Sequence, residues 1–217
     1  MTFSLVARCR QTGQLGVAVA TSDIAVGSRV PHAVAGAGAV ATQHRTDPRL
    51  GARGLALLRS GCDAAETVDA LVASTPHHGW RQLAVVDAQG GAATFSGERV
   101  EATYADLRGD GCAVIGNMLA TDEVGPAMLE AAGEPLAERL MSALEAALAA
   151  GGELAPVRSA ALLVAGSQPF PLVDLRVDLD DRPLLRLREL WDAYRPRVDE
   201  FIARALDPDA VDAEAPA

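Results

Sequence analysis

The order of hydrophobic and polar positions at the start of the chain is typical of a β-strand. Side chains of residues 2–9 alternate between two faces, with Phe3, Leu5, Ala7 and Cys9 on one and Ser4, Val6 and Arg8 on the other. A turn at residues 10–14 follows, in which Gly13 suits a positive φ angle, and an apolar run then spans residues 15–21. We therefore predict an antiparallel hairpin whose second strand is deeply buried.

Segments of two kinds follow along the rest of the chain. Short apolar or alternating runs predict strands at residues 33–42, 81–87, 92–96, 112–116, 159–165 and 172–178. The helix-start signals are Asp47-Pro48, an N-cap followed by proline at N1, and the capping box Asp63–Glu66. Helical spacing predicts one helix pair after these signals, a second pair between residues 122 and 150, and a last helix from about Pro183 to Ala205.

The alternation of hairpins with paired helices predicts an α+β fold rather than a doubly wound parallel sheet. The polar residues 98–110 are expected to form a loop. We expect a single domain over residues 1–206 and an acidic tail over 207–217 that has little to bury.

Composition narrows the classes of partner and compartment. The chain of 217 residues is 49% hydrophobic but only 4% aromatic, so its core is expected to consist mostly of Ala, Val and Leu. A net charge of −10 argues against nucleic acid and anionic membranes as partners. The three cysteines form no CxxC pair, and the chain shows neither a signal-type stretch nor a run of 18 uncharged apolar residues. We expect a soluble, cytoplasmic protein.

Two patterns that resemble binding motifs have simpler explanations. Residues 36–41 match G-x-G-x-x-A, but dinucleotide binding requires a helix that begins inside the motif, and the next helix signal comes only at Asp47. The adjacent His77 and His78 follow a proline in a polar turn, which favours a solvated loop over metal ligation. His44 leaves a buried strand and is a candidate to line a pocket. We expect no cofactor and no metal.

Thr2 is the principal candidate for chemistry. Cytosolic aminopeptidases generally remove an initiator methionine when the next side chain is as small as threonine. The mature residue would then carry a free α-amine beside its own hydroxyl, so that base and nucleophile belong to one residue. Because an α-amine has an ordinary pKa of about 7.7 to 8.0, a sizeable fraction is unprotonated near neutrality. Many cytosolic chains begin Met-Thr without this consequence, so other residues must support the assignment.

Motifs spread over nearly the whole chain support a family assignment. They are Thr2, Gln43, Thr46-x-Pro48, the hairpin at 81–96, Gly116-Asn-Met-Leu119, Ser159-Ala-Ala-Leu-Leu-Val164 and Asp174-Leu-Arg-Val-Asp178. In this order they closely resemble the domain-of-unknown-function family 1028, which is assigned to the N-terminal-nucleophile (Ntn) hydrolase superfamily. The resemblance implies a four-layer αββα sandwich, in which helices cover two antiparallel sheets stacked face to face.

The resemblance also implies an amide hydrolase and a set of site residues. Thr2 would be the nucleophile, and Asn117 a donor to the oxyanion together with backbone N–H groups around Gly116. The same cleft would be lined by Thr42, Gln43, His44, Arg81 and Arg176. Arg81 and Arg176 could each instead pair with a neighbouring carboxylate.

The chain departs from related patterns at several positions. All 19 basic side chains are arginine, so the lysine that orients the nucleophile in proteasome-type relatives is missing. Asp23 stands where the family often has a basic residue, and His32 and His44 replace more apolar or aromatic ones. These departures affect the expected substrate preference and even the expected competence for catalysis.

Two functions of different classes follow. The first is an amidohydrolase that cleaves an amide bond in a small or peptide-like substrate through an acyl-enzyme on Thr2. The second is a catalytically inactive Ntn-like scaffold that binds a small ligand or a protein partner. Exposed strand edges and small-residue helix faces are compatible with a homodimer.

Overall fold

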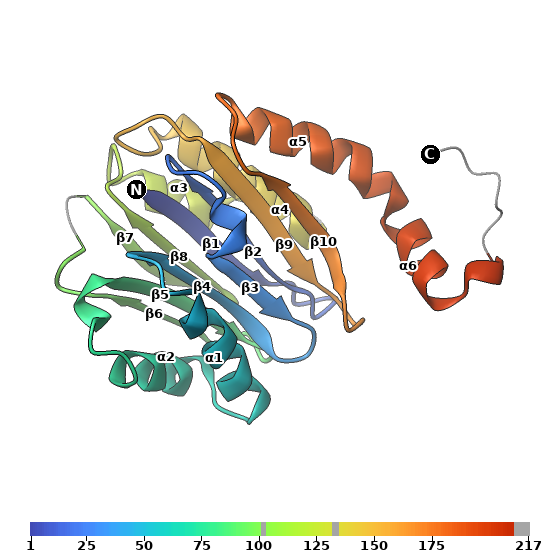
Figure 1. Cartoon of the computed structure of the whole chain (residues 1–217), viewed down its shortest axis with the longest axis horizontal. Coiled ribbons are helices and arrows are strands. Elements are labelled where there is room, and N and C mark those ends of the chain that lie inside the picture. Colours follow the sequence, from blue (N-terminus) through green and yellow to red (C-terminus); the bar gives the residue numbers. More distant parts are fainter. Residues whose placement is uncertain (101–102, 132–134, 211–217) are drawn as a thin grey trace.

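A computed structural model describes residues 1–100, 103–131 and 135–210, which form two antiparallel sheets and the helices that cover them (Figure 1). In spatial order the six-stranded sheet consists of β10 (Pro171–Val177), β9 (Ser159–Ala165), β2 (Leu15–Thr21), β1 (Thr2–Arg8), β8 (Cys112–Asn117) and β7 (Ala105–Gly109). The four-stranded sheet consists of β3 (Pro31–Val34), β4 (Gly38–His44), β5 (Arg81–Asp87) and β6 (Ala92–Ser96). The α+β prediction is confirmed.

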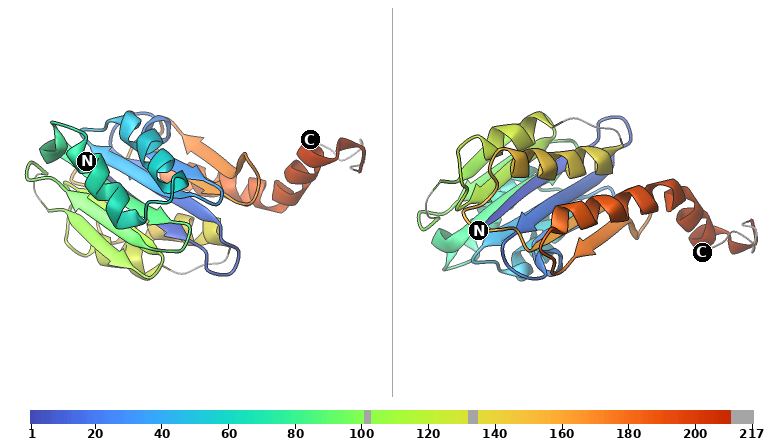
Figure 2. Two further views of the ribbon diagram at one scale, coloured as in Figure 1. Left: turned by 90° about the horizontal axis from the view of Figure 1, so that it is seen from below. Right: turned by 90° about the horizontal axis from the view of Figure 1, so that it is seen from above.

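The strand β1 lies in the middle of the larger sheet and is buried on both faces. Phe3, Leu5 and Ala7 pack in the apolar cluster shared with the helices, as the alternation of residues 2–9 predicts. Val6 packs instead in a second cluster, which contains residues from both sheets. Figure 2 shows the two sheets with their broad faces toward each other. Because side chains alternate along a strand, Thr2 lies on the same face of β1 as Val6, which is the face toward the second sheet.

Helices cover the outer face of each sheet. Helices α3 (Val124–Glu130), α4 (Leu136–Ala149) and α5 (Pro183–Tyr194) pack on the six-stranded sheet, and α1 (Pro48–Arg59) and α2 (Ala64–Ala73) pack on the four-stranded one (Figure 2). Asp47 caps α1 by accepting a hydrogen bond from the Arg49 N–H, and Asp63 and Glu66 form the predicted capping box of α2. None of the helices in the described ranges combines the length and the apolar character needed to cross a membrane.

Three predicted segments were wrong in detail. Residues 33–42 are not one strand but the turn and flanking strands of the β3–β4 hairpin, because Gly36 adopts a φ of +69° and reverses the chain. The expected loop at 98–110 contains the edge strand β7, whose Ala105 and Leu107 pack inward while its other residues remain polar.

The last helix is the third correction. It ends at Tyr194, where the 3-10 turn η3 (Arg195–Arg197) contains Pro196 and leads into a separate α6 (Val198–Leu206). Proline lacks the N–H that a continuous helix would need at this position. Part of the expected tail is the short 3-10 turn η4 (Pro208–Ala210), and residues 211–217 lie outside the described part of the chain.

Candidate functional site

Thr2 begins β1 between two neighbouring strands. It lies opposite Asn117 of β8, and the following residue, Phe3, lies opposite Ala20 of β2. The Thr2 side chain is only 7% exposed and is directed toward the second sheet. Its Oγ1 is 3.2 Å from the Thr21 Oγ1, and both hydroxyls donate hydrogen bonds to the Met1 carbonyl oxygen. The Met1 carbonyl oxygen therefore accepts the single hydroxyl proton that each threonine can donate.

A pocket of about 340 Å³ adjoins the Thr2 side chain. Three parts of the chain surround it: the start of β1 with the end of β2, the loop that contains the 3-10 turn η1 (Val26–Ser28), and the β4–α1 connection with the start of β5. The lining residues are Met1, Thr2, Thr21, Asp23, Val26, Arg29, Val30, His44, Arg45, Thr46 and Arg81. A threonine hydroxyl at the end of a sheet thus borders a space that can hold a small molecule.

The pocket is lined by three arginines and one carboxylate. Arg29 uses its guanidinium within the loop: it lies 3.3 Å from Asp23 and donates to the carbonyls of Ile24 and Ala25 at 2.6 and 2.9 Å. Arg81 donates to the carbonyl of Arg45, and its nearest carboxylate oxygen, on Asp47, is 4.0 Å away. The Arg81 Nε is buried and has no hydrogen-bond partner among the described residues. The lining is therefore positively charged overall.

His44 and Arg45 are positioned by Trp80, which closes the 3-10 turn η2 (His78–Trp80). The His44 ring is stacked on Trp80 with 6.0 Å between ring centroids, and its Nδ1 is 3.0 Å from the Trp80 carbonyl oxygen. The Arg45 guanidinium lies 5.5 Å from the same indole ring. His44 reaches the pocket at a φ of +68°, an uncommon conformation for a residue other than glycine.

Below Thr2, buried polar side chains connect the two sheets. The Ser4 hydroxyl donates to Gln43 Oε1 at 2.6 Å, and Gln43 Nε2 donates to Gln82 Oε1 at 2.9 Å and to the Thr2 carbonyl at 3.4 Å. Asn117 Nδ2 donates to the same Gln82 oxygen at 3.1 Å. We call Ser4, Gln43, Gln82 and Asn117 the inter-sheet polar cluster. It fixes the distance between the sheets directly beneath the candidate nucleophile.

The structure brings most of the predicted site residues together. Thr2, His44 and Arg81 line the pocket, and Gln43 and Asn117 belong to the inter-sheet polar cluster next to Thr2. Thr42 and Gly116 are buried but do not line the pocket: the Thr42 hydroxyl donates to the Asp47 carbonyl oxygen at 3.5 Å, and the Gly116 carbonyl accepts from Gln82 Nε2 at 2.8 Å. Because Asn117 is fully buried and directs its amide N–H to Gln82, its role as an oxyanion donor stays a prediction.

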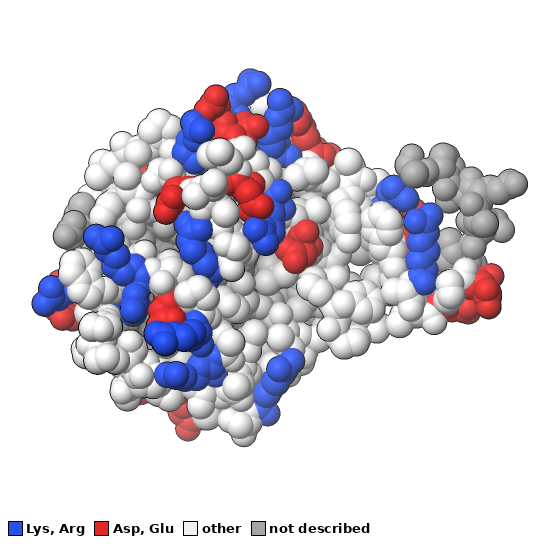
Figure 3. Space-filling view, viewed as in Figure 1, with Lys and Arg blue, Asp and Glu red and all other residues white. Residues whose placement is uncertain are grey.

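Arg176 also lies outside the lining of this pocket. It lies on the edge strand β10 and makes three hydrogen bonds to Asp178, at 2.9, 3.1 and 3.3 Å. Figure 3 shows basic and acidic side chains close together over the upper part of the viewed face. The pairing with a neighbouring carboxylate, which the sequence left open, is therefore the observed arrangement for Arg176.

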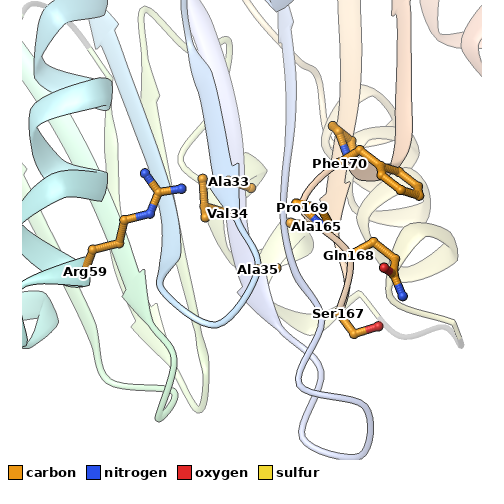
Figure 4. A pocket seen from close by; sticks show the side chains of 10 residues that line it. Ala33, Val34, Ala35, Arg59, Ala165, Ser167, Gln168, Pro169 and Phe170 are labelled. Atoms are coloured by element: carbon orange, nitrogen blue, oxygen red, sulfur yellow. The ribbon is translucent and has the colours of Figure 1, made fainter. Parts of the chain in front are cut away.

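Another pocket, of about 360 Å³, lies at the opposite end of the sheets (Figure 4). It is formed where the β3–β4 turn faces the β9–β10 loop, and its lining includes Val34, Gln168 and Phe170. Among its lining residues in the described chain, Arg59 alone is ionisable. It lacks the nucleophile and acid–base groups found beside Thr2. Within the described ranges no cluster of three or more His, Cys, Asp or Glu is suited to hold a metal ion.

Glu153 is a buried acid near the start of β1 that the sequence pattern did not single out. It follows Gly151 and Gly152, which have φ angles of +121° and +63° and turn the chain back after α4. Its side chain is 7% exposed, and its Oε2 accepts a hydrogen bond from the Ser22 N–H at 2.9 Å. Burial raises the pKa of Glu153 to about 7, although the bond from Ser22 and the nearby amino terminus act in the opposite direction. The one local signal was an acid placed directly after two glycines.

Comparisons with known proteins agree with this architecture. The model of a family of unknown function, DUF1028, matches residues 2–187. One solved structure described with the same family model is protein SPO2555 from Silicibacter pomeroyi, which is 33% identical to this chain. The match covers 89% of this chain and 85% of SPO2555, with a TM-score of 0.83. Anbu (ancestral beta-subunit) from Yersinia bercovieri is 12% identical, with 92% and 96% coverage and a TM-score of 0.40, which is too low to support an argument. No curated protein matches the chain.

Proposed function

Since the chain belongs to the DUF1028 family, whose function is unknown, the activity must be argued from the site itself, and we propose that the protein is an amide hydrolase with Thr2 as its N-terminal nucleophile. The observation that carries the proposal is the position of Thr2. The residue begins a central strand, and its hydroxyl borders a pocket of about 340 Å³. Two facing sheets with helices on their outer faces support a four-layer αββα sandwich of the Ntn type.

Removal of Met1 changes the site in three ways. It creates an α-amine on Thr2, it frees the hydroxyls of Thr2 and Thr21 from the Met1 carbonyl, and it enlarges the pocket that Met1 lines. The Thr2 hydroxyl can then attack a substrate carbonyl while the α-amine takes its proton. The Thr21 hydroxyl, 3.2 Å from the Thr2 hydroxyl, is the nearest side-chain donor for the oxyanion that forms.

The remaining steps follow from acyl-transfer chemistry. The protonated α-amine gives its proton to the leaving amine as the C–N bond breaks, which leaves an ester between the acyl group and Thr2. Water, deprotonated by the same amine, attacks the ester, and the carboxylic acid and the free Thr2 hydroxyl are released. The chain's own residues therefore supply both the nucleophile and the proton carrier.

Intact mass spectrometry of the Met-free protein tests this function. After treatment with an electrophilic acylating reagent such as a β-lactone, we expect one acyl adduct, localised to residue 2 by fragmentation. An inactive scaffold would bind ligands without any adduct, and retention of Met1 in protein from its native cells would also contradict the proposal.

The positive lining of the pocket favours a substrate that carries a carboxylate. Arg81 lines the pocket, and the nearest carboxylate oxygen, on Asp47, is 4.0 Å from its guanidinium, so its charge can still serve a substrate anion. We expect Arg81→Met to raise KM for carboxylate-bearing amides by about tenfold or more, equivalent to about 1.4 kcal/mol, and to change KM for neutral amides much less. Steady-state kinetics on matched acidic and neutral substrates measures this, and equal effects on both would contradict a carboxylate site at Arg81.

A further inference from the structure

Glu153 is a buried acid whose bonding is incomplete. One carboxylate oxygen accepts the Ser22 N–H, but Oε1 is buried and has no hydrogen-bond partner among the described residues. A buried acceptor without a donor is destabilising, and more so when it is charged. Glu153 Oε1 can therefore accept a further hydrogen bond from a group brought next to it.

The position of Glu153 relative to β1 indicates which group could donate to Oε1. On one side of β1, Phe3 pairs with Ala20, so the register places Met1 opposite Ser22, the residue that donates to Glu153. On the other side, Thr2 pairs with Asn117, and the Glu153 backbone pairs with Leu119, two residues further along. Hydrogen bonds from the Leu154 N–H to the Met118 carbonyl and from the Ala120 N–H to the Gly152 carbonyl hold this segment in place. The acid therefore lies across the amino end of β1.

The charges around Glu153 leave the amino terminus as its partner. Asp23, in the loop after β2, is occupied by Arg29 and by the Ile24 N–H. Residues 118–121, which pack on the opposite side, contain no ionisable side chain. In the last turns of α4, Glu145 is paired with Arg188. The amino terminus, which in the described chain belongs to Met1, is the one charged group that lowers the pKa of Glu153 among the described residues, and removal of Met1 moves this amine one residue along β1, to Thr2.

We propose that Glu153 is the positioning residue for the Thr2 α-amine that Met1 removal creates. Its carboxylate accepts one N–H of the amine and so turns the nitrogen lone pair toward the Thr2 hydroxyl. When the hydroxyl proton moves to the amine, the carboxylate stabilises the ammonium that results. The roles of nucleophile, base and orienting acid are then divided between two residues. This inference rests on the proposed function, but the contact between Glu153 and the amine can be tested without turnover.

The pKa of the α-amine is the readout that separates this contact from a structural role. A carboxylate beside an amine favours its protonated form and raises its pKa, so Glu153→Gln should lower the pKa of the amine. Because the chain has no lysine, an amine-directed acylating reagent modifies the α-amine alone among the amines of the protein. The pH dependence of this labelling gives the pKa of the amine. It is followed by intact mass on the full chain beginning at Thr2, after hydroxylamine has removed any ester from the Thr2 hydroxyl.

We expect Glu153→Gln to shift the midpoint of labelling downward by about one pH unit and to slow acylation of Thr2 by the β-lactone about tenfold to hundredfold. Glu153→Asp keeps the charge but shortens the reach, so its shift should be intermediate, and it carries the same test if the glutamine variant does not fold. Glu130→Gln, an exposed acid on α3, is the control for net charge and should shift neither value.

The outcomes separate the two proposals. If the labelling midpoint is the same in wild type and Glu153→Gln, the contact does not exist and the inference is overturned, whatever the enzyme does. If the midpoint falls but the wild type forms no acyl adduct, the contact is supported and the hydrolase function fails instead.

Discussion

Thr2→Ala is expected to abolish the acyl adduct and to lower kcat/KM for a cleaved amide by at least about 10³-fold. The reason is that no other group in the pocket can replace a hydroxyl that lies beside its own α-amine. Thr21 and Thr46 have hydroxyls in the pocket but no α-amine, and Ser4 is occupied with Gln43 beneath it. Steady-state kinetics and intact mass on protein lacking Met1 would measure both effects.

Thr2→Ser is the matched control for this substitution. It keeps the hydroxyl and the α-amine, and serine is small enough to allow methionine removal. We expect it to form the adduct, with activity well above that of Thr2→Ala. If Thr2→Ala turned over substrate at the wild-type rate, the nucleophile would lie elsewhere.

Gln82→Leu is expected to lower the free energy of unfolding by about 3–5 kcal/mol. The Gln82 side chain is fully buried at the centre of the inter-sheet polar cluster. Its Oε1 accepts from Gln43 and Asn117, and its Nε2 lies 2.8 Å from the Gly116 carbonyl oxygen and 3.0 Å from the Ser96 hydroxyl. Leucine has a similar size but no polar group, so it would leave these buried partners unsatisfied in both sheets.

Urea denaturation followed by circular dichroism would measure the loss of stability. Gln89→Leu makes the same chemical change at an exposed position in the β5–β6 turn and should alter stability by less than about 0.5 kcal/mol. A loss below about 1 kcal/mol for Gln82→Leu would mean that water or neighbouring groups replace its hydrogen bonds.

Features set by neighbouring residues could be predicted from the sequence. The caps at Asp47 and Asp63, the positive φ of Gly13 and the β5–β6 hairpin each depend on a few adjacent positions, and the structure confirms them. The turn at Gly36 was missed because small residues continue on both sides of it and conceal the reversal. β7 was missed because an edge strand with one apolar face carries few hydrophobic residues.

The candidate site could be predicted in part, for the same physical reason. Thr2 and Arg81 reach one pocket because each lies at the end of a strand that the hydrophobic pattern had indicated. Glu153 depends on contacts with Ser22 and Leu119, which are distant in the sequence, and an acid after two glycines carries no sign of them. The partner of Arg176 was decided by its position on an edge strand, next to Asp178.

The central place of β1 has a practical consequence for handling the protein. β2 and β8 are hydrogen-bonded to its two edges, so residues attached ahead of Thr2 would emerge at the pocket. An affinity tag or fusion partner at that end would fill the pocket and cap the amine, and the purified material would be inert for that reason alone. At the other end, α6 points away from the sheets, and a tag attached after it would leave Thr2 untouched (Figure 1).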